Sequence, residues 1–259
     1  MNSFSLSELN KISPSRRYDT KFICNKSELK NLLKTLSTDF NILDIAGNRI
    51  FTYSNLYYDT ANLDFFKSHI NGNLGRYKLR RRNYKLTGDV FIEVKYKNNK
   101  GETNKHRFKS PSLKTNISNF EDEIKTLVKK PLNKLKPQVH VDYKRITLLK
   151  PGIFEKVTID FDLSFQITDG SSIRLPNLII VEHKSKSTTE NREFYSLIKR
   201  PDFKKMSLSK YVLGLMLAKP DIKYNSYKPK LITINKICNG INSEYSQFSW
   251  SSSFSGISG

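Results

Sequence analysis

Several features that define common protein classes are scarce or missing in this sequence. Of its 259 residues only two are cysteines, Cys24 and Cys238, and their spacing matches no metal site. We therefore expect two buried, reduced thiols rather than a disulfide framework or a zinc module. No apolar run reaches the roughly 18 residues of a membrane-spanning helix, and the N-terminus has no signal-peptide pattern. The sequence thus predicts a cytoplasmic protein with no transmembrane segment of its own.

Acidic residues are scarce relative to basic ones. Asp and Glu number 24 against 45 Lys and Arg, which gives a formal net charge of +21. Hydrophobic residues at 37% and aromatic residues at 12% are too abundant for a disordered polycation. A folded protein of this charge requires an anionic partner, and nucleic acid, polyphosphate, nucleotides and acidic lipids all satisfy that requirement.

The chain contains no internal repeat and, before about residue 240, no linker rich in Pro, Gly or Ser. We predict an N-terminal extension over 1–14, one domain over 15–235, and a Ser-rich, disordered tail over 236–259. The central segment is long enough to bury a sizeable core without disulfides or metals.

Alternation of apolar and polar residues runs through most of this domain. In 157–165 the odd positions are apolar and the even positions polar, which is the pattern of a strand with one dry face and one wet face. Similar patterns predict strands at 17–24, 51–59, 76–84, 90–97, 105–109, 139–148 and 178–186. Helices are predicted at 27–36, 119–129, 189–200 and 207–220, the last with Ser207 as its N-cap. This plan indicates an α+β fold with a largely antiparallel sheet or barrel.

The wet faces carry basic side chains at i, i+2 spacing, often with one carboxylate in the row. Such rows are Arg17/Asp19/Lys21, Glu93/Lys95 and Glu182/Lys184. Neighbours in a row lie about 6–7 Å apart, from a rise of about 3.3 Å per residue. If the sheet closes with these faces inward, the gathered charge requires a polyanion, and a phosphate chain accepts the hydrogen bonds that Lys and Arg offer. An open sheet with a solvated basic face fits the pattern equally well.

Nucleic acid is the main competing partner. Most aromatic residues, however, fall on the apolar side of their strands, where they serve the core rather than base stacking. No helix-turn-helix, RNP-type or zinc-finger pattern is present. We expect only non-specific binding of RNA or DNA at low salt.

Nine short motifs follow one another in an order that is typical of one family. They are RYDTKF (17–22), LYYDT (56–60), KLRRRNY (78–84), FIEVK (91–95), KHRF (105–108), YKR (143–145), KVTIDFD (156–162), VEHK (181–184) and SLSKY (207–211). Together they resemble the VTC domain, the polyphosphate polymerase branch of the triphosphate tunnel metalloenzyme (CYTH-like) superfamily. The resemblance implies an antiparallel β-barrel that forms a tunnel, with helices packed outside.

The resemblance also implies an activity: transfer of the γ-phosphate of ATP to a growing inorganic polyphosphate chain, with Mn²⁺ or Mg²⁺. Glu182 matches the metal-binding carboxylate, and Ser209 and Lys210 match the helix that meets the terminal phosphates. Catalytic roles are implied for Lys210, Arg80 and Arg82. The positions that match substrate-binding bases are Lys21, Arg80, Arg82, Lys95, Lys105, Arg107, Arg145, Lys156, Lys184 and Lys210.

Two departures from the family pattern leave other activities open. The superfamily's E-x-E-x-K row reads Arg17, Asp19, Lys21 here, and Ser207 stands where eukaryotic polymerases tend to carry Lys. Neither an SPX module nor membrane helices accompany the domain, so it resembles a stand-alone bacterial type, and any membrane partner is left open. The alternatives are a triphosphate or polyphosphate hydrolase and a non-catalytic polyanion-binding module. Asp160 and Asp162, expected on one face, would hold a second metal or neutralise bases.

Overall fold

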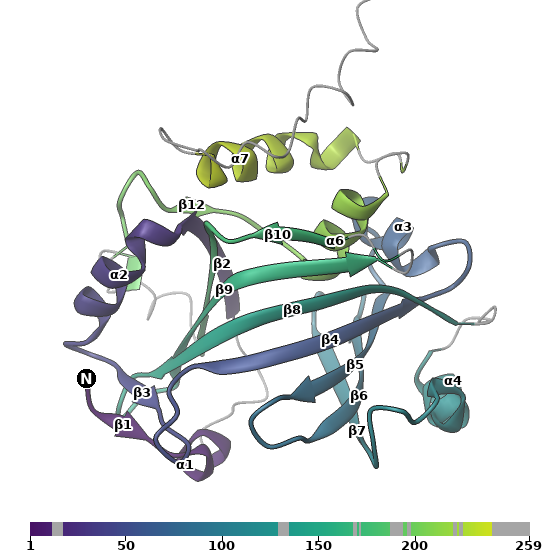
Figure 1. The fold of residues 1–259 in the computed structure, drawn as a ribbon, viewed down its shortest axis with the longest axis horizontal. Coiled ribbons are helices and arrows are strands. Elements are labelled where there is room, and N and C mark those ends of the chain that lie inside the picture. Colours follow the sequence, from purple (N-terminus) through teal and green to yellow (C-terminus); the bar gives the residue numbers. More distant parts are fainter. Residues whose placement is uncertain are drawn as a thin grey trace, which may run out of the picture.

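The computed structural model describes residues 1–11, 18–128, 135–167, 170, 172–186, 194–195, 198–219, 222 and 225–239. Arg17, most of the helix predicted at 189–200, and residues 240–259 of the predicted tail lie outside these ranges. One twelve-stranded sheet forms the body of the molecule, and it curves so that its strands face a common interior while helices lie around it (Figure 1). None of the helices in the described ranges has the length and apolar character needed to cross a bilayer.

The strands of the main path are antiparallel neighbours in the order β12-β2-β11-β9-β8-β4-β5-β6-β7. Their bounds are β2 Tyr18–Asn25, β4 Phe51–Asp59, β5 Arg76–Tyr84, β6 Val90–Lys97, β7 Thr103–Ser110, β8 Lys136–Leu149, β9 Glu155–Ile167, β11 Leu178–Ser185 and β12 Lys204–Lys205. Three short strands lie beside this path: β10 (Ser172–Leu175) on β9, β3 (Asn41–Leu43) on β8, and β1 (Ser3–Phe4) parallel to β3.

The antiparallel sheet and the outer helices agree with the predicted α+β class, but the closed barrel is not confirmed. In the described part of the chain β7 and β12 are the two edges of the path, and no ladder joins them. β12 has only two residues, and β7 is exposed along most of its length and carries charged side chains that discourage further pairing. The sheet is therefore strongly curved but open.

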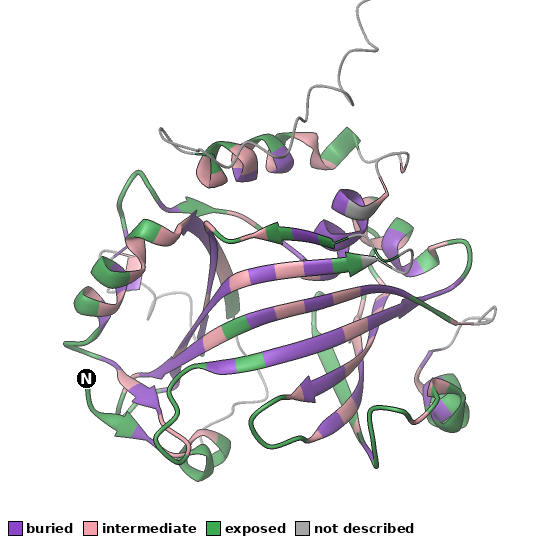
Figure 2. Ribbon diagram, viewed as in Figure 1, coloured by how far each residue is buried: buried purple, intermediate pink, exposed green. Residues whose placement is uncertain are grey.

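Helices and 3₁₀ turns complete the chain: α1 Leu6–Lys11, η1 Lys26–Glu28, α2 Leu29–Leu36, α3 Asp64–Ile70, η2 Ile117–Phe120, α4 Glu121–Leu127, α6 Lys210–Ala218, η3 Asn225–Tyr227 and α7 Lys228–Cys238. Helix α2 covers an apolar cluster on the outer face of β2, β9 and β11, while α4 covers one on β5 and β6. Figure 2 shows the outer sides of α2 and α4 exposed and the central strands largely buried. α7, which the sequence reading missed, packs Leu231 and Ile234 into the core.

Two predicted helix starts are corrected. The first helical turn begins at Lys26, capped by the side chain of Asn25, which accepts a hydrogen bond from the Ser27 N–H. α6 begins at Lys210, so Ser209 rather than Ser207 is its N-cap residue. Helix α6 packs close to the sheet because it carries Gly214, where a Cβ would lie 2.8 Å from the Phe165 ring. The start of α6 consequently faces the interior of the sheet.

A bulge in β9 separates the two aspartates that the sequence placed on one face. Asp162 has a left-handed backbone (φ 52°), and the pairing of β9 with β8 shifts register at this point. Before the bulge Phe161 packs under α2, whereas after it Phe165 packs in the cluster that includes α6. Asp160 therefore faces the interior, while Asp162 pairs with Lys26 and Lys144, which excludes a shared metal site.

Candidate functional site

A cavity of about 670 Å³ lies inside the curve of the sheet, walled by strands β2, β4–β9 and β11 and by the residues that lead into α6. Twelve basic side chains line it, against three acidic ones. The basic residues are Lys21, Lys78, Arg80, Arg82, Lys85, Lys95, Lys105, Arg107, Arg145, Lys156, Lys184 and Lys210, and the acidic residues are Asp89, Glu93 and Glu182. The structure thus brings together all ten basic positions derived from the motifs, together with Ser209 and Glu182.

Strand register explains why rows that are distant in sequence meet in this cavity. Directly paired residues of antiparallel strands share a face. Arg80 pairs with Glu93, and Glu93 with Arg107, so β5, β6 and β7 present one continuous polar face. On the other side, Glu182 of β11 pairs with Lys21 of β2. The curvature of the sheet turns these two faces toward one another.

Glu93 is the anionic centre of one wall. Its side chain is 2% exposed and lies 2.5 Å from Arg80 Nη2 and 2.6 Å from Lys105 Nζ. Arg82 and Arg107 each approach it to 3.8 Å. Burial opposes ionisation, but the surrounding cations outweigh it and hold the pKa of Glu93 below its usual range. The sequence reading gave this residue no role, although its place in the row with Lys95 was visible.

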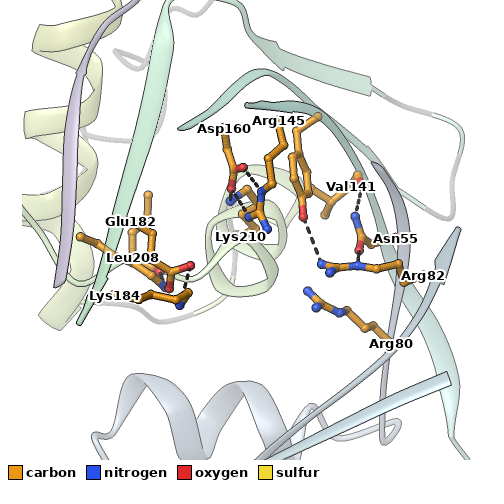
Figure 3. Close-up of polar contacts among 12 residues, drawn as sticks. Asn55, Arg80, Arg82, Val141, Arg145, Asp160, Glu182, Lys184, Leu208 and Lys210 are labelled. Carbon is orange, nitrogen blue, oxygen red and sulfur yellow. Dashed lines mark hydrogen bonds and ion pairs between the residues drawn. The ribbon is translucent and has the colours of Figure 1, made fainter. Parts of the chain in front are cut away.

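A second cluster lies where α6 meets the sheet. Arg145 binds Asp160 through two nitrogens, at 2.5 and 2.7 Å, and Lys210 Nζ contacts the same carboxylate. Burial raises the pKa of Asp160, but Arg145 and Lys210 outweigh it, and the pKa falls to about 2. Figure 3 shows Arg80 and Arg82 pointing from β5 toward this cluster across the cavity. Arg82 is fixed by hydrogen bonds to Asn55 (2.9 Å) and Tyr143 (3.0 Å).

Helix α6 is itself anchored by a buried carboxylate. Asp59 accepts hydrogen bonds from the backbone N–H groups of Thr60, Phe65 and Phe66 and from the hydroxyl of Tyr211. Burial raises the pKa of Asp59 despite these donors. Because Tyr211 directly follows Lys210, this network holds the first turn of α6 and, with it, the position of the Lys210 side chain.

Glu182 is the carboxylate that the resemblance assigns to metal binding. It lies 3.0 Å from Lys184 and 3.4 Å from Lys21, and Lys184 also binds Asp19 at 2.9 Å. No cluster of three His, Cys, Asp or Glu side chains exists among the described residues. Mg²⁺ needs only one or two carboxylates when phosphate and water supply its other ligands. Glu182, with Asp19 nearby, therefore fits a divalent cation that arrives together with a phosphate substrate.

Lys78 and Lys95 line the cavity without a direct ion pair among the described residues. Neither makes an ion pair or hydrogen bond with any residue that the structure describes. Burial, reinforced by nearby Lys21, lowers the pKa of Lys78 well below its usual value. Burial also lowers the pKa of Lys95 to about 8, although the Glu182 carboxylate partly opposes this. The charged form of a half-buried amine that lacks a paired anion is unfavourable in the free protein. This arrangement favours binding of an anion from solution.

The low pKa values give the cavity a testable pH dependence. Lys95 and Lys105 both have a pKa of about 8, chiefly because of burial. We expect affinity for inorganic triphosphate to fall roughly tenfold between pH 7 and 9 as these amines lose protons. A tenfold change corresponds to about 1.4 kcal/mol, the loss expected from one charged contact. Binding should also take up protons near pH 8. Isothermal titration calorimetry in buffers of different ionisation enthalpy measures both effects.

The free energy of unfolding of the ligand-free protein should change with pH in the direction opposite to the affinity for triphosphate. These lysines have lowered pKa values in the folded state, so between pH 8 and about 10.4 the unfolded chain binds more protons than the folded one. The free energy of unfolding should therefore rise with pH across this window. Lys95→Arg, which stays charged, should weaken the pH dependence of both the triphosphate affinity and the free energy of unfolding. A triphosphate affinity that does not change from pH 7 to 9 would contradict the role of these lysines in binding.

Comparison with known proteins adds to this picture. Residues 16–219 match the family model of the VTC domain. No curated protein sequence matches the chain. Among solved structures, an adenylate cyclase candidate from Bacillus halodurans superposes with a TM-score of 0.52 at 12% identity, covering 75% of this chain and 94% of that one. An adenylyl cyclase candidate from Hippeastrum, described as having a dominant triphosphatase activity, gives a TM-score of 0.48 at 12% identity, covering 77% and 95%.

At 12% identity, the superposition on the Bacillus halodurans protein shows a shared fold and no more. The family match is stronger evidence, because it spans most of the chain and includes every basic position that the motifs identified. Those positions were selected from nine motifs in one order, and the structure gathers them around one cavity. This protein belongs to the VTC domain family.

Proposed function

We propose that the protein is a polyphosphate polymerase that transfers the γ-phosphate of ATP to a growing polyphosphate chain inside the basic cavity. The observation that carries the proposal is the charge of the wall, with twelve bases against three acids. Lys78 and Lys95 are left unpaired there among the described residues. A bound polyanion would supply the negative charge that the cavity wall lacks. ATP is abundant in the cytoplasm, where we place the protein.

The proposed reaction needs no covalent intermediate on the protein. A terminal oxygen of the acceptor chain attacks the γ-phosphorus of ATP, the bond to the β-phosphate oxygen breaks, and ADP leaves. The protein contributes positioning and electrostatic stabilisation of the transferring group. Lys210, Arg80 and Arg82 would hold that group, because they converge on one space from opposite walls (Figure 3).

The remaining bases, together with Ser209, would bind the triphosphate and guide the chain: Lys21, Lys95, Lys105, Arg107, Arg145, Lys156 and Lys184. Glu182 would hold Mn²⁺ or Mg²⁺. When bound, such a cation neutralises phosphate charge and polarises the transferring group. For Glu182 to serve this role, Lys21 and Lys184 must turn from it toward phosphate oxygens, which the flexible lysine side chain permits.

A non-catalytic polyanion-binding module is the second candidate. Its support is the small number of carboxylates available to a metal, since Glu182 already has two lysine partners and no three-ligand cluster occurs in the described ranges. Such a protein would bind triphosphate and polyphosphate without turnover.

One experiment separates these functions. The purified protein is incubated with ATP and Mn²⁺, and the products are examined on a polyphosphate gel and in a free-phosphate assay. Long chains on the gel are the expected result. Free phosphate without chains would indicate the hydrolase. Neither product, together with tight triphosphate binding by calorimetry, would indicate the binding module.

A further inference from the structure

One end of the cavity differs in chemistry from the rest. Six apolar side chains line it, and we call them the apolar mouth: Leu6, Leu9, Leu43, Ile45, Leu86 and Phe91. Leu6 and Leu86 are 45% and 44% exposed, so large apolar side chains face solvent at the opening of a highly charged cavity. An exposed apolar cluster that borders a binding cavity is more typical of a ligand contact than of a surface without function.

The first half of this mouth depends on the N-terminal segment. β1 pairs in parallel with β3, with Phe4 opposite Leu43, and this pairing places α1 beside the chain around Ile45. The helix start is secured by Ser5 and Glu8, whose side chains each bond the other's backbone N–H, at 3.3 and 2.7 Å. β1 and α1 precede residue 16, where the family match begins, whereas β3 and Ile45 lie inside the matched range. The mouth is thus partly built from sequence outside the matched domain.

The second half presents a flat, partly aromatic surface. The Arg107 guanidinium lies 3.8 Å from the centre of the Phe91 ring, and its Nη2 donates a hydrogen bond to the hydroxyl of Tyr84 at 2.9 Å. The Arg107 side chain is 42% exposed, so its outer face is open to solvent. Planar guanidinium groups and aromatic rings are the surfaces on which nucleic-acid bases stack.

Strand geometry places the bases of the cavity in sequence behind this mouth. Along β5, Tyr84 at the mouth is followed inward by Arg82, Arg80 and Lys78, each on the same face. Along β6, Phe91 is followed by Glu93 and Lys95. At about 3.3 Å per residue, the row from Tyr84 to Lys78 is about 20 Å long. The cavity therefore carries its apolar and aromatic side chains at the end near Tyr84, beside Lys85 and Arg107, and its densest row of bases further in.

We propose that the apolar mouth seats the base of the nucleotide substrate, with the triphosphate directed inward along β5. Polyphosphate is charged along its whole length and gains nothing from leucine side chains, whereas a nucleoside triphosphate has an aromatic end and an anionic end that match the two parts of the cavity. The inference rests on the proposed function and extends it. It assigns base recognition to α1 and the β5–β6 turn, and it sets the direction in which the nucleotide enters.

The test compares the affinity of two probes, ATP and inorganic triphosphate, by calorimetry with a chelator present so that neither probe is turned over. The readout is the ratio of the two Kd values within each variant of the full-length protein. We expect the double variant Leu6→Ser/Leu86→Ser to bind ATP about tenfold more weakly than the unaltered protein does, while its affinity for triphosphate stays the same. Unchanged triphosphate binding also shows that the variant is folded.

Leu74→Ser is the matched control, because Leu74 is 57% exposed and does not line the cavity. It should leave both affinities unchanged. Equal loss of ATP and triphosphate binding in the double variant, or no loss of either, would overturn the base seat and leave the proposed function intact. Failure of the unaltered protein to bind either probe would overturn the proposed function, and this inference with it.

Discussion

Replacing Glu93 with Gln is expected to lower the free energy of unfolding by about 3–5 kcal/mol in the absence of phosphate ligands, the usual cost of removing one partner from a buried ion pair. The carboxylate is 2% exposed and has Arg80, Arg82, Lys105 and Arg107 within 3.8 Å. Gln keeps the volume of the side chain and removes its charge, which leaves these cations close together without an anion. Urea denaturation at pH 7 measures the change.

The same variant should respond to ligand more strongly than the unaltered protein. Inorganic triphosphate supplies the charge that Glu93 no longer provides, so saturating triphosphate should recover much of the lost stability. Glu102→Gln is the matched control, since Glu102 is exposed and outside the cavity, and it should change stability by less than about 0.5 kcal/mol. A loss below about 1 kcal/mol for Glu93→Gln would show that the cations do not depend on this carboxylate.

Acid should reproduce the effect in the unaltered protein. The pKa of Glu93 is lowered in the folded state, because the cations outweigh the effect of burial. Its contribution is therefore present above the unfolded pKa, about 4.3, and decreases as the pH falls through the folded value. Part of the acid sensitivity of this protein should consequently be absent from Glu93→Gln.

The walls of the cavity were predictable from sequence because a period of two assigns each residue to a face. Arg80, Arg82 and Lys95 were placed on the polar face of their strands, and the structure has them there. Antiparallel pairing then aligns these faces without further information. Closure was not predictable in this way, because it depends on the tilt and stagger of strands that are distant in sequence, and no ladder joins β7 to β12 among the described residues.

Features that depend on a single backbone irregularity escaped the sequence reading. The left-handed residue Asp162 moves the following residues of β9 to the opposite face, and nothing in an alternating pattern marks such a bulge.

The role of Glu93 was missed for a different reason. A carboxylate in a basic row looks like a neutralising charge until the register shows how many cations surround it. The apolar mouth joins α1 to the β5–β6 turn, which are about 80 residues apart.

For the proposed polymerase reaction, removing the amine of Lys210 should have the largest effect on activity. Lys210 lies in the first turn of α6, its Nζ contacts Asp160 and lies 4.6 Å from the centre of the Tyr143 ring, and its side chain is 15% exposed. A cation held in this way stabilises charge on a transferring phosphoryl group with little reorganisation. We expect Lys210→Ala to reduce kcat about 100-fold or more while KM for ATP changes by less than about fivefold.

Folding should survive this change, because Arg145 continues to pair with Asp160 through both nitrogens and Asp59 continues to hold Tyr211. Initial rates of chain growth with ATP and Mn²⁺ measure the effect, and Lys210→Arg should recover part of kcat since it restores the charge. Lys30→Ala, an exposed lysine of α2, is the control and should leave the rate unchanged. If Lys210→Ala raised KM and kept kcat, Lys210 would bind the nucleotide equally in the ground and transition states. Stabilisation of the transferring phosphoryl group would then have to be assigned to Arg80 and Arg82 alone.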